Sequence, residues 1–418
     1  MSTAPESADL LLKGGRVIDP ANGIDAPLDV AIKNGKISQV APDLPGEGAA
    51  SVLDVSGRYV TPGLIDMHVH AFITHQRSNL SVLSEAHAFP AGVTTVVDAG
   101  TGGWRDFPLF KEQVIDRAKI RILSFVNIVG SGMGGEWEHD GKEMNPRLAA
   151  DVVAAYPDVA VGIKTAHYWA LRPFDAEHPP WLAVDRAIEA ASLCGKPVMF
   201  DFCPWPVERP YKTLLLEKMR PGDIHTHVFA QQFRVLDDYG KVQDFMWAAR
   251  ERGVIFDLGH GAGSFWYRNA VPAIQQGFKP DSISTDLHTG NINGSVFDML
   301  TTVNKCLNMG MSLGEVIDAS TRAPAREVGH PELGTLSVGS DADVAVFDLH
   351  DGSFSYWDCG RARLAGKQKL VCALTVRGGK VVYNPEGLGM PLWEEAPDRY
   401  WWDPAEKRTT KPIRGDGG

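Results

Sequence analysis

Residues 60–70 read Val60-Thr-Pro-Gly-Leu-Ile-Asp-Met-His68-Val-His70, an apolar run that follows Pro-Gly and ends in two histidines. Side chains two apart on a β-strand point to the same face, about 6 to 7 Å apart along it. At the mouth of a barrel, this spacing lets His68 and His70 turn toward one metal ion. Two satisfied surface histidines are the alternative, and the rest of the chain has to decide between them.

The composition is that of an ordinary globular protein. The 418 residues suffice for one large domain and a smaller one. The chain is 44% hydrophobic and 22% charged, and it has no apolar run long enough to span a bilayer. A net charge of −11 argues against a nucleic-acid partner, which calls for a basic face. We therefore expect a small-molecule substrate, with neither nucleic acid nor membrane as a partner.

The N-terminus and the cysteines indicate a cytoplasmic protein. The first nine residues are polar and acidic, without the basic and then apolar pattern of a signal peptide. Five scattered cysteines are too few for a disulfide framework or a four-thiolate zinc site; they are Cys194, Cys203, Cys306, Cys359 and Cys372.

Short strand-like pieces occupy both ends of the chain. They run from Asp9 to about Tyr59, with Asn34-Gly35 in the style of a β-hairpin turn. A matching set reappears at residues 342–348 and 373–383. We expect the two ends to pair into one small β-domain.

Between the ends, short apolar runs alternate with longer amphipathic stretches, which predicts repeated strand-helix units and a parallel sheet. The eight predicted strands are Leu64–His70, Thr94–Ala99, Ile122–Val129, Val161–Thr165, Val198–Phe202, Ile224–Phe229, Ile255–Gly259 and Ser282–Thr285. Eight such strands favour a closed (β/α)8 barrel of α/β class, whose chemistry lies at the carboxyl ends of the strands. An open doubly wound sheet is the alternative.

Metal-competent side chains follow five of these strands. They are His68 and His70, Lys164, Asp201, His225 and His227, and Asp286 with His288; His260 follows strand seven. An open sheet does not predict such a ring of ligands, so the barrel is favoured.

With these residues in place, the chain resembles the amidohydrolase superfamily over nearly its whole length. The resemblance rests on Pro62–His70, Gly162-Ile-Lys164, Thr226-His227-Val-Phe, Ser284-Thr-Asp286 and the block 334–347. These motifs are similar to the dihydroorotase-like and hydantoinase-like branch, including its hydrolases of acyl amides and acyl esters. The resemblance implies a (β/α)8 TIM-like barrel at residues 61–332, with a small β-sandwich from residues 1–60 and 333–388. A Trp-rich tail covers residues 389–418.

The resemblance also implies a two-metal site. Neutral imidazole suits zinc, so His68 and His70 would hold the more buried ion, and Asp286 would complete its shell. Lys164 would be carboxylated to a carbamate that bridges both ions, and His227 would serve the second ion. The alternative for Lys164 is a buried structural lysine or a phosphate contact. We expect two zinc ions per chain, with manganese or iron as alternatives.

Such a site predicts a metal-dependent hydrolase of an amide, a cyclic amide or a carboxylic ester. Two metal ions lower the pKa of a water and polarise a carbonyl, and Asp286 would act as general base and then general acid. The alternatives are a deaminase or decarboxylase of the superfamily, or a non-catalytic oligomeric scaffold. Deaminases of the superfamily typically carry a His-x-x-Glu pattern after strand five, and this chain has none there.

Asp201 departs from the family, which usually has histidine at the end of strand five. Three interpretations compete: Asp201 binds the second metal, it leaves that metal weakly held, or His225 takes its place. We predict the first, because a carboxylate is a competent zinc ligand. We expect His225 to share a face with His227, two residues deeper in the barrel.

Four further residues are predicted to bind substrate, namely His260, His288, His167 and Trp169. Arg172 and Arg209 are interpreted as surface arginines, with binding of a carboxylate as the alternative. The tail carries Trp393, Tyr400, Trp401 and Trp402, which predicts docking on the barrel or on a second subunit, and hence a homo-oligomer.

Overall fold

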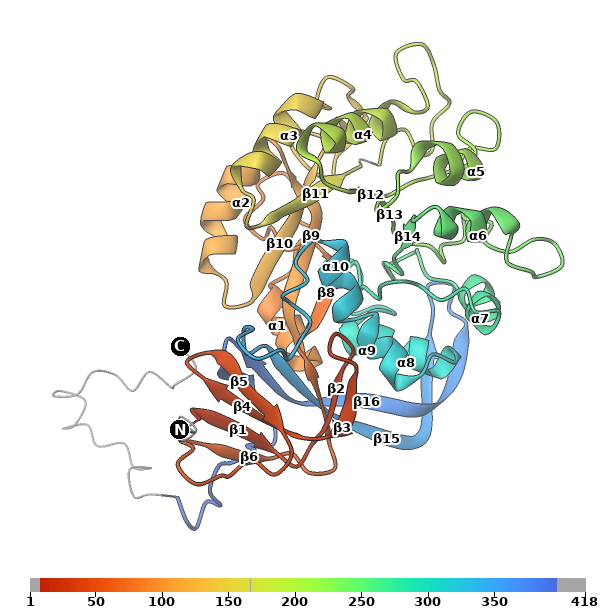
Figure 1. The fold of residues 1–418 in the computed structure, drawn as a ribbon. Coiled ribbons are helices and arrows are strands. Elements are labelled where there is room, and N and C mark those ends of the chain that lie inside the picture. Colours follow the sequence, from red (N-terminus) through yellow and green to blue (C-terminus); the bar gives the residue numbers. More distant parts are fainter. Residues whose placement is uncertain (1–7, 166, 397–418) are drawn as a thin grey trace.

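A curled parallel sheet forms the centre of the molecule (Figure 1). The computed structural model describes residues 8–165 and 167–396. Seven strands follow one another in chain order, each parallel to the next. They are β8 (Leu64–Val69), β9 (Val93–Gly103), β10 (Arg121–Asn127), β11 (Ala160–Lys164), β12 (Val198–Phe200), β13 (Ile224–His225) and β14 (Ile255–Phe256).

The segment 282–287 bridges the two edges of this sheet. Ser282 forms a parallel bridge with Asp257, just after β14, and Leu287 forms one with Val69 of β8. The amide of His70 also donates to the Leu287 carbonyl at 2.9 Å. The molecule is therefore an α/β barrel. The prediction of a regular eighth strand was wrong, because this segment makes only isolated bridges.

Helices cover the outside of the sheet (Figure 1). They are α1 (Ser84–Ala88), α2 (Phe107–Gln113), α3 (Pro146–Ala155), α4 (Leu182–Cys194), α5 (Tyr211–Thr213), α6 (Asp244–Glu251), α7 (Tyr267–Gln275), α8 (Met299–Met309), α9 (Leu313–Asp318) and α10 (Arg322–Glu327). Local sequence sets where several begin. Asn145 caps α3 before Pro146, Asp298 caps α8, and Ser312 with Glu315 forms a capping box on α9.

The two chain ends pair as predicted. One sheet has the order β5-β4-β1-β6, and the other has the order β17-β16-β15-β7-β2-β3. These strands are β1 (Leu10–Lys13), β2 (Arg16–Asp19), β3 (Ile24–Pro27), β4 (Asp29–Lys33), β5 (Lys36–Ala41), β6 (Val52–Asp54), β7 (Tyr59–Pro62), β15 (Val344–Trp357), β16 (Arg363–Arg377) and β17 (Lys380–Tyr383). The β4-β5 hairpin turns at Asn34 and Gly35, whose φ angles are 51° and 73°.

The opening motif joins the two parts of the molecule. Val60 pairs with Val346 in the chain-end sheet, and four residues later Leu64 begins the barrel sheet. Gly63 lies between them, where a Cβ atom would come within 2.2 Å of Thr94 Oγ1. Every residue of β8 is buried, so this strand is a fixed base for the two histidines at its end.

The start of the tail is exposed. Trp393 has 79% of its surface accessible, and Met390 and Leu392 have 68% each. Tyr400, Trp401 and Trp402 lie outside the described residues. Within the described residues, every helix is too short or too polar to cross a membrane.

Candidate metal centre

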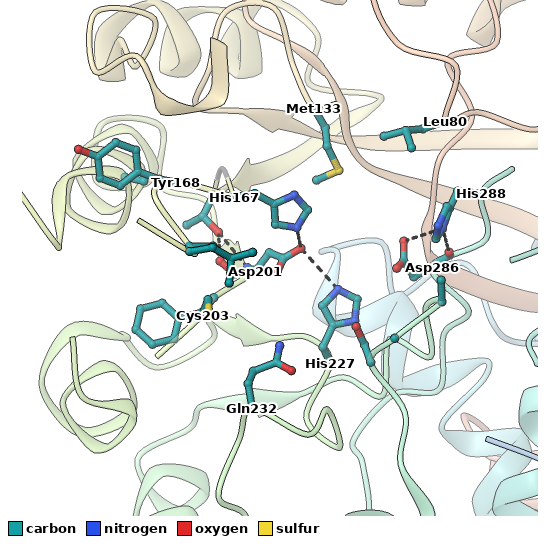
Figure 2. A pocket seen from close by; sticks show the side chains of 18 of the residues that line it. Leu80, Met133, His167, Tyr168, Asp201, Cys203, His227, Gln232, Asp286 and His288 are labelled. Atoms are coloured by element: carbon teal, nitrogen blue, oxygen red, sulfur yellow. Dashed lines mark hydrogen bonds and ion pairs between the residues drawn. The ribbon is translucent and has the colours of Figure 1, made fainter. Parts of the chain in front are cut away.

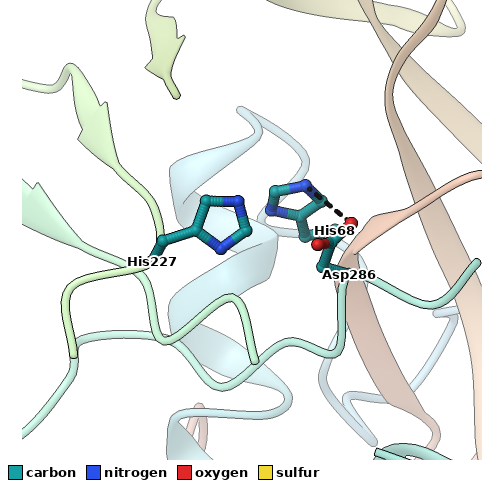
Figure 3. A group of neighbouring side chains, drawn as sticks. All are labelled: His68, His227 and Asp286. Carbon is teal, nitrogen blue, oxygen red and sulfur yellow. Dashed lines mark ion pairs between the residues drawn. The ribbon is translucent and has the colours of Figure 1, made fainter. Parts of the chain in front are cut away.

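The carboxyl ends of the parallel strands bring the predicted metal ligands together, as expected for a barrel. His68 and Lys164 are in the last two residues of their strands, Asp201 and His227 follow theirs within two residues, and Asp286 lies in the bridging segment. All five are buried or nearly so, and Figure 3 shows His68, His227 and Asp286 converging. One ligand atom from each of these three lies within 4.8 Å of the others.

Asp286 lies against both histidines of the opening motif. Its Oδ1 atom is 3.0 Å from His70 Nε2 and 3.5 Å from His68 Nε2. Asp286 has a φ angle of 51°, and a Cβ on Gly261 would come within 2.7 Å of its Oδ2. The backbone turn and the neighbouring glycine therefore hold this carboxylate against the imidazoles.

A hydrogen-bond chain fixes the tautomer of His68. Thr226 Oγ1 donates to Asp257 Oδ2 at 2.7 Å, and its hydroxyl has only this one hydrogen to donate. His68 Nδ1, 2.9 Å from the same Oγ1, must therefore donate its own hydrogen. It follows that Nε2 of His68 carries a lone pair.

Hydrogen bonds also fix the tautomers of the other two imidazoles, His70 and His227. Thr101 Oγ1 donates to Asp98 Oδ2 at 2.8 Å, so it accepts from His70 Nδ1 at 2.7 Å. His227 Nδ1 donates to the Gly259 carbonyl at 2.6 Å. In the neutral form of both residues Nε2 keeps a lone pair, which is the arrangement that orients histidine ligands in metal sites. Burial lowers the pKa of His227, but the Asp201 carboxylate outweighs this and raises it, so a cation that binds Nε2 replaces a proton there.

In this cluster of histidines and carboxylates, hydrogen-bond acceptor atoms therefore lie opposite one another. Nε2 of His70 and Oδ1 of Asp286 are 3.0 Å apart, and the ring hydrogen of His70 is already used on Thr101. Two lone pairs at this distance repel each other unless a cation or a proton lies between them. The donor set of neutral imidazole and carboxylate fits zinc or a similar divalent ion.

Lys164 and Asp201 form a second group beside the first. Lys164 Nζ is fully buried, 3.4 Å from His68 Nε2 and 3.8 Å from Asp201 Oδ2. Asp201 Oδ2 also lies 3.5 Å from His227 Nε2. Gly100 makes room for this lysine, because a Cβ there would come within 2.6 Å of Lys164 Cβ.

His167 completes the second group, a role that the sequence does not predict for it. Its Nε2 lies 2.6 Å from Asp201 Oδ2 (Figure 2). The Asp201 carboxylate raises the pKa of His167 to about 9, although the side chain is about half exposed. The sequence predicts only substrate binding for this residue, and no spacing rule links it to Asp201, 34 residues later.

Asp201→Asn is expected to lower metal content by up to one ion per chain, because an amide oxygen is a weaker zinc ligand than a carboxylate. The measurement is metal per chain after dialysis against zinc, by elemental analysis. Asp175→Asn removes an exposed carboxylate and serves as the control. Unchanged metal content together with a raised KM would move Asp201 to the substrate side.

His225 does not point to this cluster. Its Nδ1 is 2.6 Å from the Thr226 carbonyl, and its ring packs against Tyr211, Phe233 and Phe256. The expectation that His225 shares a face with His227 was wrong, because the φ angle of 63° at His227 breaks the alternation of the strand. The structure therefore does not support His225 as a substitute for Asp201.

His260 is also placed away from the pocket. It is fully buried, its ring stacks on Phe265 at 4.5 Å, and its Nε2 lies 2.6 Å from Lys305 Nζ. Lys305 Nζ also donates to the Ser295 carbonyl at 2.6 Å. The substrate-binding prediction for His260 is corrected accordingly, because a buried lysine holds this imidazole instead.

Burial lowers the pKa of Lys305 from 10.5 to about 7. Between these two pH values the unfolded chain binds a proton that the folded chain does not, so this group makes stability rise with pH in that range. Lys305→Met removes the effect. We expect the difference in Tm, variant minus parent, to fall steadily from pH 7 to pH 10. A difference independent of pH would contradict the lowered pKa.

A cavity of about 520 Å³ opens over the cluster. His70, His167, Asp201, Asp286 and His288 are among its lining residues, together with apolar side chains. His288 Nδ1 is 2.7 Å from the Asp286 carbonyl, so this predicted substrate residue also holds the Asp286 backbone. Trp169 is not among the lining residues; its ring stacks on His178 at 3.5 Å.

Arg172 and Arg209 differ in their burial and in whether they line the cavity. Arg172 binds the exposed Glu136 at 2.8 Å and is outside the cavity lining, as the surface interpretation expects. Arg209 lines the cavity and is only 3% exposed, so the surface interpretation was wrong for it.

Comparison with known proteins agrees with this geometry. Residues 267–382 match the model of the amidohydrolase family. A protein of Enterococcus faecalis named deacetylase is 32% identical over 380 residues, covering 90% of this chain and 99% of that protein. A crystal structure of an adenine deaminase matches with a TM-score of 0.81 at 30% identity, covering 90% of this chain and 100% of that chain. A dihydroorotase structure gives 0.77 at 28% identity, covering 90% and 99%.

The chain therefore belongs to the amidohydrolase family, as its motifs predicted. It is an enzyme that hydrolyses amide and related C–N bonds, and its substrates are small molecules.

Proposed function

We propose that the protein hydrolyses an amide, a cyclic amide or a carboxylic ester of a small molecule, with divalent metal ions held at the carboxyl end of the barrel. One observation carries this proposal. The hydrogen bonds of Thr226, Thr101 and Gly259 leave Nε2 of three buried histidines with a lone pair, and these atoms lie around buried carboxylates. The protein has built a ligand set and has satisfied every other polar atom of these three imidazoles.

His68, His70 and Asp286 would hold one ion. Asp201, His227 and a carbamate on Lys164 would hold the other, and zinc is the metal we propose, with manganese or iron as alternatives. When bound, such ions polarise a substrate carbonyl and lower the pKa of water toward neutrality. The burial of Lys164 beside His68 supports the carbamate. A carbamate is anionic, so it and the Nε2 lone pair of His68 would both be ligands for a cation bound next to them.

Asp286 is the proton carrier in this proposal. Burial raises the pKa of Asp286, but His68, His288 and His70 outweigh this in their protonated forms and hold it well below its usual value, and a divalent cation in the same place would act in the same direction. The carboxylate is thus ionised at neutral pH and ready to take a proton from the attacking water, which it then passes to the leaving nitrogen or oxygen. His288 fixes its orientation through the backbone carbonyl.

Several wider assignments belong to the same proposal. We assign residues 61–332 to the barrel, and residues 1–60 and 333–388 to a small β-sandwich. One apolar cluster supports the sandwich, because it contains Leu12 and Val30 of one sheet and Val60 and Val346 of the other. We also propose a cytoplasmic homo-oligomer, supported by the exposed Trp393 at the start of the tail.

The test is an assay of purified, zinc-loaded protein. N-acyl amino acids, lactams and acyl hydroxy acids are offered, and the released acid or amine is measured beside the metal content. Turnover of a member of this panel with bound metal is the expected result. Release of ammonia from adenine, with no turnover of the panel, would instead support the activity named for the adenine deaminase structure. Absence of metal after loading would overturn the proposal.

A further inference from the structure

Arg209 is a buried arginine in the wall of the candidate active site. It follows β12 and lines the same cavity as Asp286, with only 3% of its surface accessible. Its Nη1 atom donates to the Tyr168 carbonyl at 3.0 Å. The guanidinium also lies over two aromatic rings, 5.1 Å from the centre of Phe174 and 5.0 Å from that of Phe202. Nη1 also donates to the Pro180 carbonyl at 3.4 Å, so packing and these two hydrogen bonds fix the position of the side chain.

Two of its nitrogens are left over. Nε and Nη2 are buried and have no hydrogen-bond partner among the described residues. These two atoms lie on the same edge of the planar guanidinium, where their N–H bonds run nearly parallel. This edge is the one that binds a carboxylate through two hydrogen bonds. Burying it without a partner is costly, so it is expected to have one in the working protein.

The charge of Arg209 is also left without a partner. Burial lowers its pKa to about 10, which still leaves the group cationic at neutral pH. Among the described residues, no carboxylate lies within ion-pair distance of it. Arg220, by contrast, is only partly buried and forms an ion pair with Asp223 at 2.8 Å. A buried cation without an anion is strongly unfavourable.

Arg209 lines a cavity that has room for an anion, and because Nε and Nη2 have almost no accessible surface, a carboxylate reaches them when the side chain shifts toward the cavity. Figure 2 shows Asp286 and His288 on one side of the cavity, and Tyr168 and Cys203 on the other. Arg209 is bonded to the Tyr168 carbonyl, so it belongs to the side away from Asp286. Met133, Val184 and Phe202 are among the apolar residues that line the cavity. A molecule with its scissile bond at Asp286 can thus extend an anionic group toward Arg209.

We propose that Arg209 binds a carboxylate of the substrate through its Nε–H and Nη2–H edge, so that the substrates are acylated compounds that carry a free carboxylate. A single guanidinium balances one negative charge, which suits a carboxylate better than a phosphate dianion. The assignment of Arg209 as a substrate-binding residue rests on the proposed hydrolytic function. The affinity of Arg209 for a carboxylate is independent of that function.

The kinetic test compares N-acetylphenylalanine, which carries a free carboxylate, with N-acetylphenylalaninamide, in which a neutral amide replaces that carboxylate. The quantity measured is the ratio of kcat/KM for the acid to that for the amide, from acetate release. Arg209→Met is expected to lower this ratio by about 10²-fold, the effect of losing a pair of charged hydrogen bonds. Arg172→Met, which alters an arginine already paired with Glu136, should keep the parent ratio.

A binding test needs no turnover. The zinc-loaded protein is heated with 3-phenylpropionate or with 3-phenylpropanol, and the rise in Tm is measured. The carboxylate should stabilise the parent and the Arg172→Met variant more than the alcohol does, and Arg209→Met should lose this difference. If this occurs while no acylated compound is hydrolysed, the carboxylate site stands and the proposed function fails.

Three results would overturn the proposal. They are an unchanged ratio in Arg209→Met, an equal fall in Arg172→Met, and equal stabilisation by the acid and the alcohol. If Arg209→Met does not fold, Arg209→Lys decides, since it keeps a cation and a donor for the Tyr168 carbonyl but lacks the two-point edge. We expect it to lower the ratio about tenfold, and a parent ratio in this variant would also overturn the proposal.

Discussion

Asp286→Asn is expected to lower kcat by roughly 10²- to 10⁴-fold, the usual effect of removing a general acid-base group. The amide has nearly the same shape but cannot take a proton from water. The fold should survive, because asparagine tolerates the left-handed backbone that Asp286 adopts with a φ angle of 51°. The measurements are kcat on the best substrate of the panel and Tm.

Metal content separates the two roles given to Asp286. A large fall in kcat with full metal content assigns it to proton transfer, and a parallel loss of metal assigns it chiefly to ligation. Asp175→Asn removes the same charge from an exposed loop residue and should leave both quantities unchanged. Near-normal kcat in Asp286→Asn with full metal content would remove this residue as the proton carrier.

The part of the site that the sequence predicted is the part fixed by regular strands. His68 is the next-to-last residue of the fully buried strand β8, and Lys164 is the last residue of β11. Parallel strands in chain order place their carboxyl ends at one edge, so residue type at a strand end is enough to bring such side chains together. The pairing of β7 with β15 followed in the same way from alternating patterns at both chain ends.

The rest depended on contacts that no local pattern contains. Lys305, which holds His260, is 45 residues away in the chain, and Arg209 is anchored by a carbonyl 41 residues before it. His225 and His227 were expected on one face, but the left-handed backbone at His227 separates them. The residue type determines which groups a side chain can bind, whereas the geometry of the loops determines which groups it contacts in the folded protein.

Lys164→Ala is expected to remove about one metal ion per chain and to lower kcat/KM by at least about 10²-fold. An ammonium has no lone pair for a cation, so Lys164 can serve as a metal ligand only after carboxylation. Its Nζ lies 3.4 Å from His68 Nε2 and 3.8 Å from Asp201 Oδ2, between the two groups. Metal per chain and kcat/KM are the measurements.

Two further observations separate a carbamate from a structural lysine. A short carboxylic acid such as propionate, added to Lys164→Ala, would occupy the emptied space and restore part of the metal and the activity. Lys305→Met is the matched control, because Lys305 is equally buried but contacts His260 and the Ser295 carbonyl rather than a carboxylate. It should keep full metal content. If Lys164→Ala also keeps full metal content, Lys164 holds no metal and its burial serves the packing of the barrel alone.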